Sequence, residues 1–156
     1  WYLSIVDVLL IMLDIILLVL FGTTLSTIIC YPLKTQGQMS AVGTIISSGY
    51  GFICGAYMPI SQFGNVLQNI LSFFPSTYAT SLIRNHTMRG IISEMKKIGF
   101  PNEAIINIEN SVDYNTYFFG NLVKVWQMYL ILGGFIIIMI IFFVVLNKIK
   151  LKNKNN

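Results

Sequence analysis

The chain has very little charge. Only 10% of its 156 residues are Asp, Glu, Lys or Arg, whereas 55% are hydrophobic. Soluble domains contain about 25% charged residues, so this composition argues against an ordinary soluble domain and predicts a protein embedded in membrane lipid. It also argues against nucleic acid as a partner, because binding DNA or RNA needs a basic stripe on a water-facing surface.

Residues that perform catalysis or bind metals are also scarce. The two cysteines, Cys30 and Cys54, lie in apolar runs and are predicted to be small buried hydrophobes. The one histidine, His86, has no nucleophile or acid at a recognisable spacing, and we interpret it as a polar residue at the membrane edge. The sequence contains no Gly-x-x-x-x-Gly-Lys-Ser/Thr loop for phosphate binding. We therefore expect no enzymatic activity, and no cofactor or metal bound by this chain.

Long apolar runs are abundant. The first contains 19 consecutive uncharged residues ending at Leu33, and the last contains 22 ending at Leu146, close to the roughly 20 that a helical span needs. The second is rich in small residues and includes Gly51 and Gly55 at Gly-x-x-x-Gly spacing, which lets helices approach closely in lipid. A small-residue helix without a specific partner is the alternative. Three runs are predicted to span the membrane: residues 3–33, 39–60 and 122–146.

A fourth apolar run, residues 63–83, is broken near its middle at Phe74-Pro75-Ser76. Each half is about 10 residues long and too short to cross a core of roughly 30 Å. Pro75 lacks an amide hydrogen and disfavours helix in the preceding residue, whereas Ser76 or Thr77 could cap a second helix. The pattern predicts two reentrant half-helices, with a single kinked span as the alternative.

The stretch from residue 84 to 120 is polar, and its basic and acidic residues balance. It is predicted to form a small external loop region with a helix at Ile91–Ile98, ended by Gly99 and Pro101, and a short helix at Asn102–Ile108. The predicted fold class is therefore an all-α membrane protein, with three transmembrane helices, a reentrant helical hairpin and this loop region.

The lysines predict the orientation of the chain. Four of the ten basic residues lie in the tail at residues 147–156, which the positive-inside rule places in the cytoplasm. The loop at residues 84–120 and Trp1 would then be external, and the link at Lys34 cytoplasmic. Trp126 and Tyr129 fit the aromatic belt at the membrane interface. We expect a multi-pass protein of the plasma membrane.

Two acidic residues stand out in the first apolar run. Asp7 and Asp14 are seven residues apart and so lie on one face of a helix. A charge at Asp14 among leucines and isoleucines is costly in lipid, so this side chain either lines a substrate path or helix contact, or lies near enough to the interface to be wetted. Asp7 is predicted to be wetted.

Two short motifs resemble a known family. The run Gly55-Ala56-Tyr57-Met58-Pro59 closes the small-residue span, and Phe74-Pro75-Ser76-Thr77-Tyr78-Ala79 follows, and then Arg84. In this order they resemble the membrane (permease) subunits of type-2 ATP-binding-cassette (ABC) exporters. The resemblance covers nearly the whole chain and implies that residues 1–156 form the C-terminal half of a permease domain.

The resemblance also implies a function. Two permease copies of six spans each pair around a central path, and ABC ATPase subunits, which bind the ATP and magnesium, drive the export of a drug, a lipid-linked molecule or another amphipathic cargo. The alternative is a non-transporting membrane anchor or assembly subunit that packs through its small residues. By position, the candidate residues of the substrate path and external gate are Asp14, Gly51, Gly55, Pro59, Phe74, Pro75, Tyr78 and Arg84.

Overall fold

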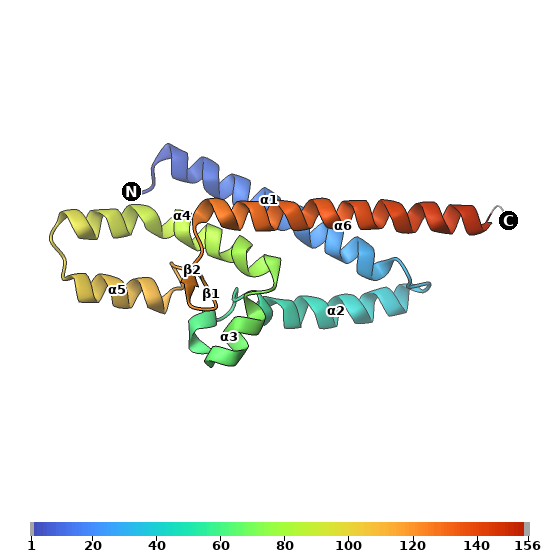
Figure 1. Cartoon of the computed structure of the whole chain (residues 1–156), viewed down its shortest axis with the longest axis horizontal. Helices are drawn as coiled ribbons and strands as arrows, with labels where there is room; N and C mark the ends of the chain where they lie inside the picture. Colours follow the sequence, from blue (N-terminus) through green and yellow to red (C-terminus); the bar gives the residue numbers. More distant parts are fainter. Residues whose placement is uncertain (1, 155–156) are drawn as a thin grey trace.

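Three long helices pack against one another at the centre of the computed structural model, which describes residues 2–154. They are α1 (Ile5–Cys30), α4 (Pro75–Lys97) and α6 (Val125–Lys154) (Figure 1). Their core is apolar and small, and it includes Phe21, Leu82 and Leu132. The mainly helical class is confirmed. Within the described residues, two helices are long and apolar enough to cross a membrane, Ile5–Cys30 and Val125–Lys152.

The start of α1 explains part of the role of Asp7. Ser4 is the N-cap, its hydroxyl accepts the amide of Val6, and its own amide donates to Asp7 Oδ2 at 3.0 Å. This capping box satisfies amides that have no partner within the helix. It fixes the first turn of α1 through bonds between neighbouring residues.

The second predicted span, residues 39–60, is not confirmed. Helix α2 (Gln36–Ile53) begins earlier, at an N-cap Thr35 paired with Gln38, and its 18 residues measure about 27 Å at 1.5 Å per residue. It ends before Pro59, because Gly55 adopts a φ of 73° that stops the helix. The Ala56 and Gly55 amides donate back to Gly51 and Phe52 at 2.9 and 3.1 Å, which is a Schellman motif.

This ending changes the meaning of the Gly-x-x-x-Gly pair. Gly51 lies within α2, but Gly55 lies beyond it, so the two glycines do not form one helix face. The space beside Gly51 is filled by the ring of Tyr57, which folds back over the helix end. The spacing therefore reflects a helix stop and not a contact between helices.

The break at Pro75 is confirmed, but the two segments on either side of it are unequal. Before it lie the turn η1 (Ile60–Gln62) and the short helix α3 (Asn65–Leu71), and after it α4 continues for 23 residues to Lys97. Pro75 occupies the first turn of α4, where its missing amide costs nothing, and Phe74 is the extended N-cap. Ser76 and Thr77 are not caps, contrary to prediction. The predicted end at residue 83 is also wrong, because α4 continues through the polar residues that follow.

The predicted external region contains less loop than expected. The helix expected at Ile91–Ile98 is the second half of α4, and it ends at Lys97 before Gly99, as predicted. The expected helix at residue 102 is confirmed as α5 (Asn102–Ser111). A two-stranded hairpin, β1 (Tyr117–Phe118) with β2 (Asn121–Leu122), was not predicted.

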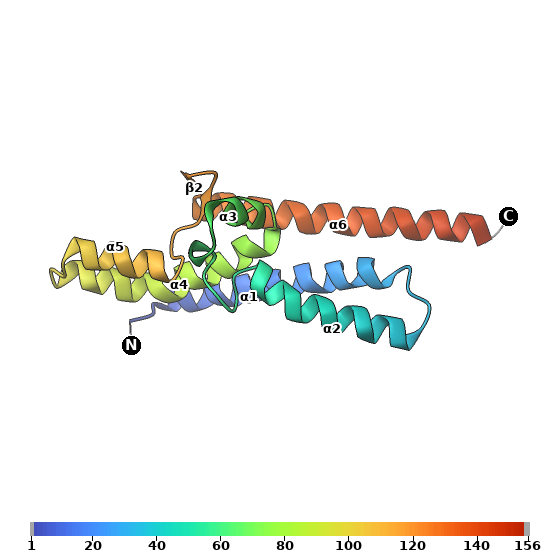
Figure 2. The same cartoon turned by 90° about the horizontal axis from the view of Figure 1, so that it is seen from below.

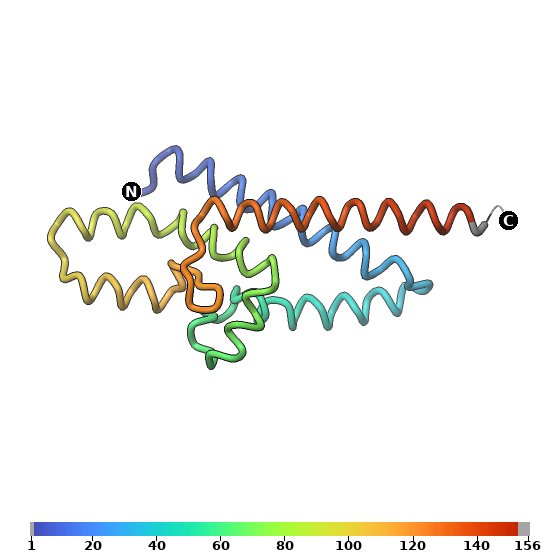
Figure 3. The backbone as a smooth tube through the Cα atoms, in the orientation of Figure 1, coloured from blue at the N-terminus to red at the C-terminus, as the bar shows by residue number. Residues whose placement is uncertain are grey.

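The α1–α2 link and the start of the basic tail lie at the same end of the molecule. Tyr31 at the end of α1 donates its hydroxyl to the carbonyl of Leu146 at 3.1 Å, and the Lys150 ammonium lies 4.7 Å from the Tyr31 ring centroid. The N-terminal end of α1, the hairpin and α5 lie toward the other end (Figures 2 and 3).

Candidate functional site

A cluster of three polar side chains lies between the central helices. The carboxylate of Asp14 on α1 accepts the hydroxyl of Tyr129 on α6 at 2.5 Å and lies 2.6 Å from Nδ1 of His86 on α4. The His86 and Tyr129 rings are stacked with their centroids 6.2 Å apart. One carboxylate therefore joins all three helices of the core.

The burial of Asp14 and His86 makes their pairing important for stability. Asp14 is 0% exposed and His86 is 2% exposed. An isolated charge in such a place costs several kcal/mol unless it is paired and hydrogen-bonded. Hydrogen bonds to both carboxylate oxygens compensate further for the lost solvation.

These contacts decide what the sequence left open. Asp14 is a helix contact and is not wetted. The interpretation of His86 as an interfacial residue is wrong, because its ring is buried against Asp14. Tyr129 was predicted to belong to the aromatic belt, but its hydroxyl points into the core and donates to Asp14. The signal that could have identified the cluster was a His and an Arg three residues apart on a continuous helix, facing two acids on one face of another.

A second ion pair lies nearer the N-terminal end of α1. Arg89 Nη2 lies 2.6 Å from Asp7 Oδ1, so the two acids of α1 face two basic side chains of the antiparallel α4. Asp7 was predicted to be wetted, but it is buried. One turn of α4 beyond His86, Gly90 lies so close to the Tyr2 carbonyl that a side chain there would overlap it.

Arg84 connects the segments that surround the break. Its guanidinium donates to the Gly55 carbonyl at the end of α2 and lies 3.4 Å from Asp113 Oδ2. The Asp113 carboxylate also accepts the amides of Ile60 and Ser61 at the start of η1, the latter at 3.1 Å. We call Arg84, Gly55, Asp113 and these two amides the arginine hub. It joins α4, α2, η1 and the segment after α5.

Hydroxyl groups of α4 hold the neighbouring chain in a similar way. Thr80 donates to the Cys54 carbonyl at 2.6 Å, Tyr78 donates to Ser72 at 2.6 Å, and Thr77 donates to Leu71 at 2.9 Å. These three bonds satisfy carbonyls at the ends of α2 and α3 that have no partner within their helices. The irregular backbone before Pro75 is thereby fastened to α4.

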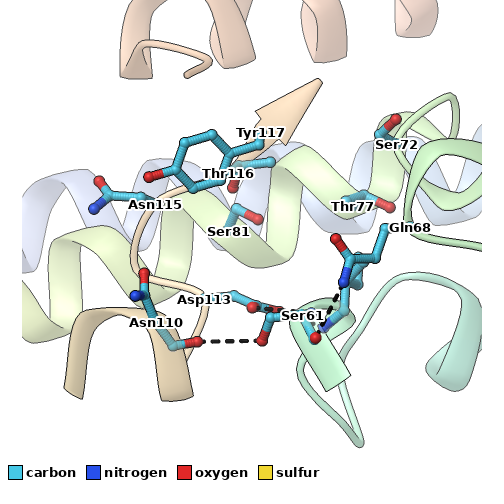
Figure 4. Close-up of a pocket in the computed structure, with 11 residues that line it drawn as sticks. Ser61, Gln68, Ser72, Thr77, Ser81, Asn110, Asp113, Asn115, Thr116 and Tyr117 are labelled. Carbon is cyan, nitrogen blue, oxygen red and sulfur yellow. Dashed lines mark hydrogen bonds between the residues drawn. The ribbon is translucent and has the colours of Figure 1, made fainter. Parts of the chain in front are cut away.

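A small polar pocket lies beside the hub. It has a volume of about 120 Å³ and is lined mainly by hydroxyl, amide and carboxylate side chains (Figure 4). Ser61 donates to the Asn110 carbonyl at 3.2 Å across one side. Thr116 also lines it, and its buried hydroxyl has no hydrogen-bond partner within residues 2–154.

The predicted gate residues lie in four separate places. Arg84 and Gly55 meet directly, and Pro59 precedes the η1 amides that Asp113 accepts. Tyr78 and the Phe74-Pro75 break lie at the start of α4, next to α3. Asp14 belongs to the separate three-helix cluster, and Gly51 lines a cavity between α1 and α2. Sequence reasoning missed Asp113, Thr80 and Arg89, whose partners are too distant in sequence for any local pattern.

No protein-family model, curated protein or solved structure matches this chain.

The α1–α2 cavity has a volume of about 350 Å³ and is lined largely by small side chains. Every residue of α2 is exposed or half-buried, so this helix packs loosely beside the central three. The small residues that contribute to the cavity wall include Gly22, Ser26, Gly43, Ser47 and Gly51.

Among residues 2–154, no three His, Cys, Asp or Glu side chains gather in a way that could hold a metal ion.

Proposed function

We propose that this chain is the membrane-embedded permease portion of an ATP-driven ABC exporter. It works with an ABC ATPase subunit and a second permease copy in the plasma membrane. Helices α1, α2 and α6 cross the lipid, and the chain moves an amphipathic molecule without hydrolysing ATP itself. The basic tail and the α1–α2 link face the cytoplasm.

The observation that supports this proposal most is the segment folded back between α2 and α4. The turn η1 and the seven-residue α3 are too short to span lipid, yet Asp113 of the arginine hub bonds to η1, and the α4 hydroxyls of Thr77 and Tyr78 bond to the end of α3. Irregular backbone at membrane depth is tolerated only where protein or water satisfies it. A small polar pocket lies beside this segment, as an external gate at the mouth of a path requires.

The contacts suggest how such a gate would work. The end of α2 and the start of η1 are both fixed to Arg84, directly or through Asp113. A shift of α2 relative to α4, driven by the ATPase at the cytoplasmic end, would strain these bonds and release η1 and α3 together. The bonds of the arginine hub then hold the gate in its closed state.

A second candidate function is a non-transporting anchor or assembly subunit. The loosely packed α2 and the small-residue walls of the α1–α2 cavity favour it, because both fit a helix of another protein. The two functions differ in one respect: an anchor needs no opening of the segment between α2 and α4.

Cysteine accessibility separates the two functions. Ser72 is buried beside the polar pocket, whereas Ile98 is exposed in the turn after α4, so the two positions can be compared in a chain with Cys30 and Cys54 replaced by Ala. In intact cells, a membrane-impermeant maleimide should label Ile98→Cys under all conditions. It should label Ser72→Cys several-fold faster in energised cells than in ATP-depleted cells. Equal slow labelling of Ser72→Cys in both states, with Ile98→Cys labelled normally, would favour the anchor.

A further inference from the structure

The β-hairpin before α6 has an unusual tip. Phe118 pairs with Asn121, which leaves Phe119 and Gly120 as a two-residue loop with φ angles of 48° and 79°. Such a loop needs positive φ at both positions and is normally Asn-Gly or Gly-Gly. A bulky phenylalanine in the left-handed region is strained, and strain of this kind persists where a side chain has a use.

Phe119 belongs to an exposed aromatic group. The ring centroids of Phe73 and Phe118 are 5.3 Å apart, those of Phe73 and Phe119 are 5.7 Å apart, and those of Phe118 and Phe119 are 4.9 Å apart, all edge-to-face. Phe73 is 60% exposed and Phe119 is 53% exposed. We call these three residues the aromatic wedge. Phe118 is half-buried, whereas Phe73 and Phe119 present more than half of their surface outward.

The position of the wedge along the molecule fixes what it meets. The hairpin ends at Leu122, three residues before α6 begins at Val125. Trp126, in the first turn of α6, is 58% exposed and points away from the core. If α6 crosses the membrane, its first turn lies at the interface, and the hairpin lies beside it at the same level (Figures 1 and 2). Aromatic rings are favoured at that depth.

We propose that the aromatic wedge inserts into the lipid interface at the N-terminal end of α6, and that its partner is the headgroup and upper acyl region of the bilayer. This inference rests on the proposed crossing of the membrane by α6. The wedge ties α3, through Phe73, to the lipid surface. The segment before Pro75 is therefore held from two sides, by the arginine hub toward the core and by lipid toward the outside.

Fluorescence quenching tests the proposal. Trp1 and Trp126 are replaced by Phe, and single tryptophans are placed by Phe119→Trp, Phe73→Trp or Phe135→Trp in the full chain. Phe135 is exposed and lies ten residues along α6, so its variant reports the membrane crossing itself. The proteins are reconstituted in phosphatidylcholine vesicles brominated either near the headgroup or near the chain end. Aqueous iodide is the opposing quencher.

The expected result is at least twofold stronger quenching of Phe119→Trp and Phe73→Trp by shallow than by deep bromines, with the reverse for Phe135→Trp. Strong iodide quenching of both wedge variants without bromine quenching would place the wedge in water and overturn the inference. Resistance to both quenchers would place it against protein and also overturn it. Loss of bromine quenching in Phe135→Trp would instead overturn the membrane crossing on which the inference depends.

Discussion

At the scale of single residues, Asp14 is bonded to both other helices of the core through its two carboxylate oxygens. Removing one partner of a buried pair leaves an uncompensated polar group, and such changes cost about 3–5 kcal/mol. The amide of asparagine can still accept from Tyr129 and donate to a neutral His86. The size of a substitution's effect should therefore depend on whether both bonds survive.

We predict that Asp14→Ala lowers the free energy of unfolding by about 3–5 kcal/mol, whereas Asp14→Asn lowers it by less than half as much. Denaturant unfolding in detergent micelles, followed by circular dichroism, measures both. The adjacent Leu13→Ala, at an exposed position, is the control and should change stability by about 0.5 kcal/mol or less. Equal losses for Asp14→Ala and Leu13→Ala would contradict the role of the cluster.

Two glycines give a second residue-scale prediction. Gly55 has a φ of 73° and a side chain there would crowd Ile60, whereas Gly43 is surrounded by open space within α2. Gly55→Ala should destabilise the protein by at least about 1–2 kcal/mol, the cost of the left-handed conformation. Gly43→Ala should be neutral or stabilising by up to about 1 kcal/mol. Thermal unfolding of the two variants side by side checks the sign of each effect.

At the scale of elements, the arginine hub and Thr80 join α2 to α4. We predict that Arg84→Gln and Thr80→Val each loosen the end of α2 and leave α1, α4 and α6 packed. Hydrogen exchange should speed up by at least about tenfold at the amides of Gly55, Ile60 and Ser61, which corresponds to about 1.4 kcal/mol, while the central helices keep their protection.

Tyr129→Phe is the matched control for this prediction, because it removes a hydrogen bond from the other cluster. It should cost about 1.5–3 kcal/mol of global stability without selectively exposing the end of α2. An equal increase in hydrogen-exchange rate at all amides of Arg84→Gln would contradict a local role for the hub.

Elements with a strong local signal were predictable, and those defined by distant partners were not. Apolar runs gave α1 and α6, Pro75 gave the break, and Gly99 gave the end of α4. The polar composition after Ile83 obscured the continuation of α4, because His86 and Arg89 are satisfied by acids more than 70 residues away. The hairpin was missed because its tip has Phe119 where a typical turn has Asn.

At the scale of the whole molecule, the shared end of the α1–α2 link and the basic tail predicts a sidedness pattern. In a chain without Cys30 and Cys54, an impermeant maleimide added to intact cells should label Ile98→Cys, in the exposed turn after α4. It should leave Lys34→Cys and Lys150→Cys unlabelled until the membrane is permeabilised. Labelling of Lys34→Cys and Lys150→Cys on opposite sides would contradict the arrangement of α1 and α6.

The three-helix cluster also has a consequence in time. Asp14 is 72 residues ahead of His86 and 115 residues ahead of Tyr129 along the chain. At about 5–20 residues per second, Tyr129 is synthesised roughly 6–23 s after Asp14. Until His86 is synthesised, α1 has an unpaired acid among apolar residues, and neither α4 nor α6 is present to pair with it. A newly synthesised α1 should therefore remain beside the insertion machinery until α4 and α6 have been made. The first helix then completes its integration into the membrane only after the last helix is present.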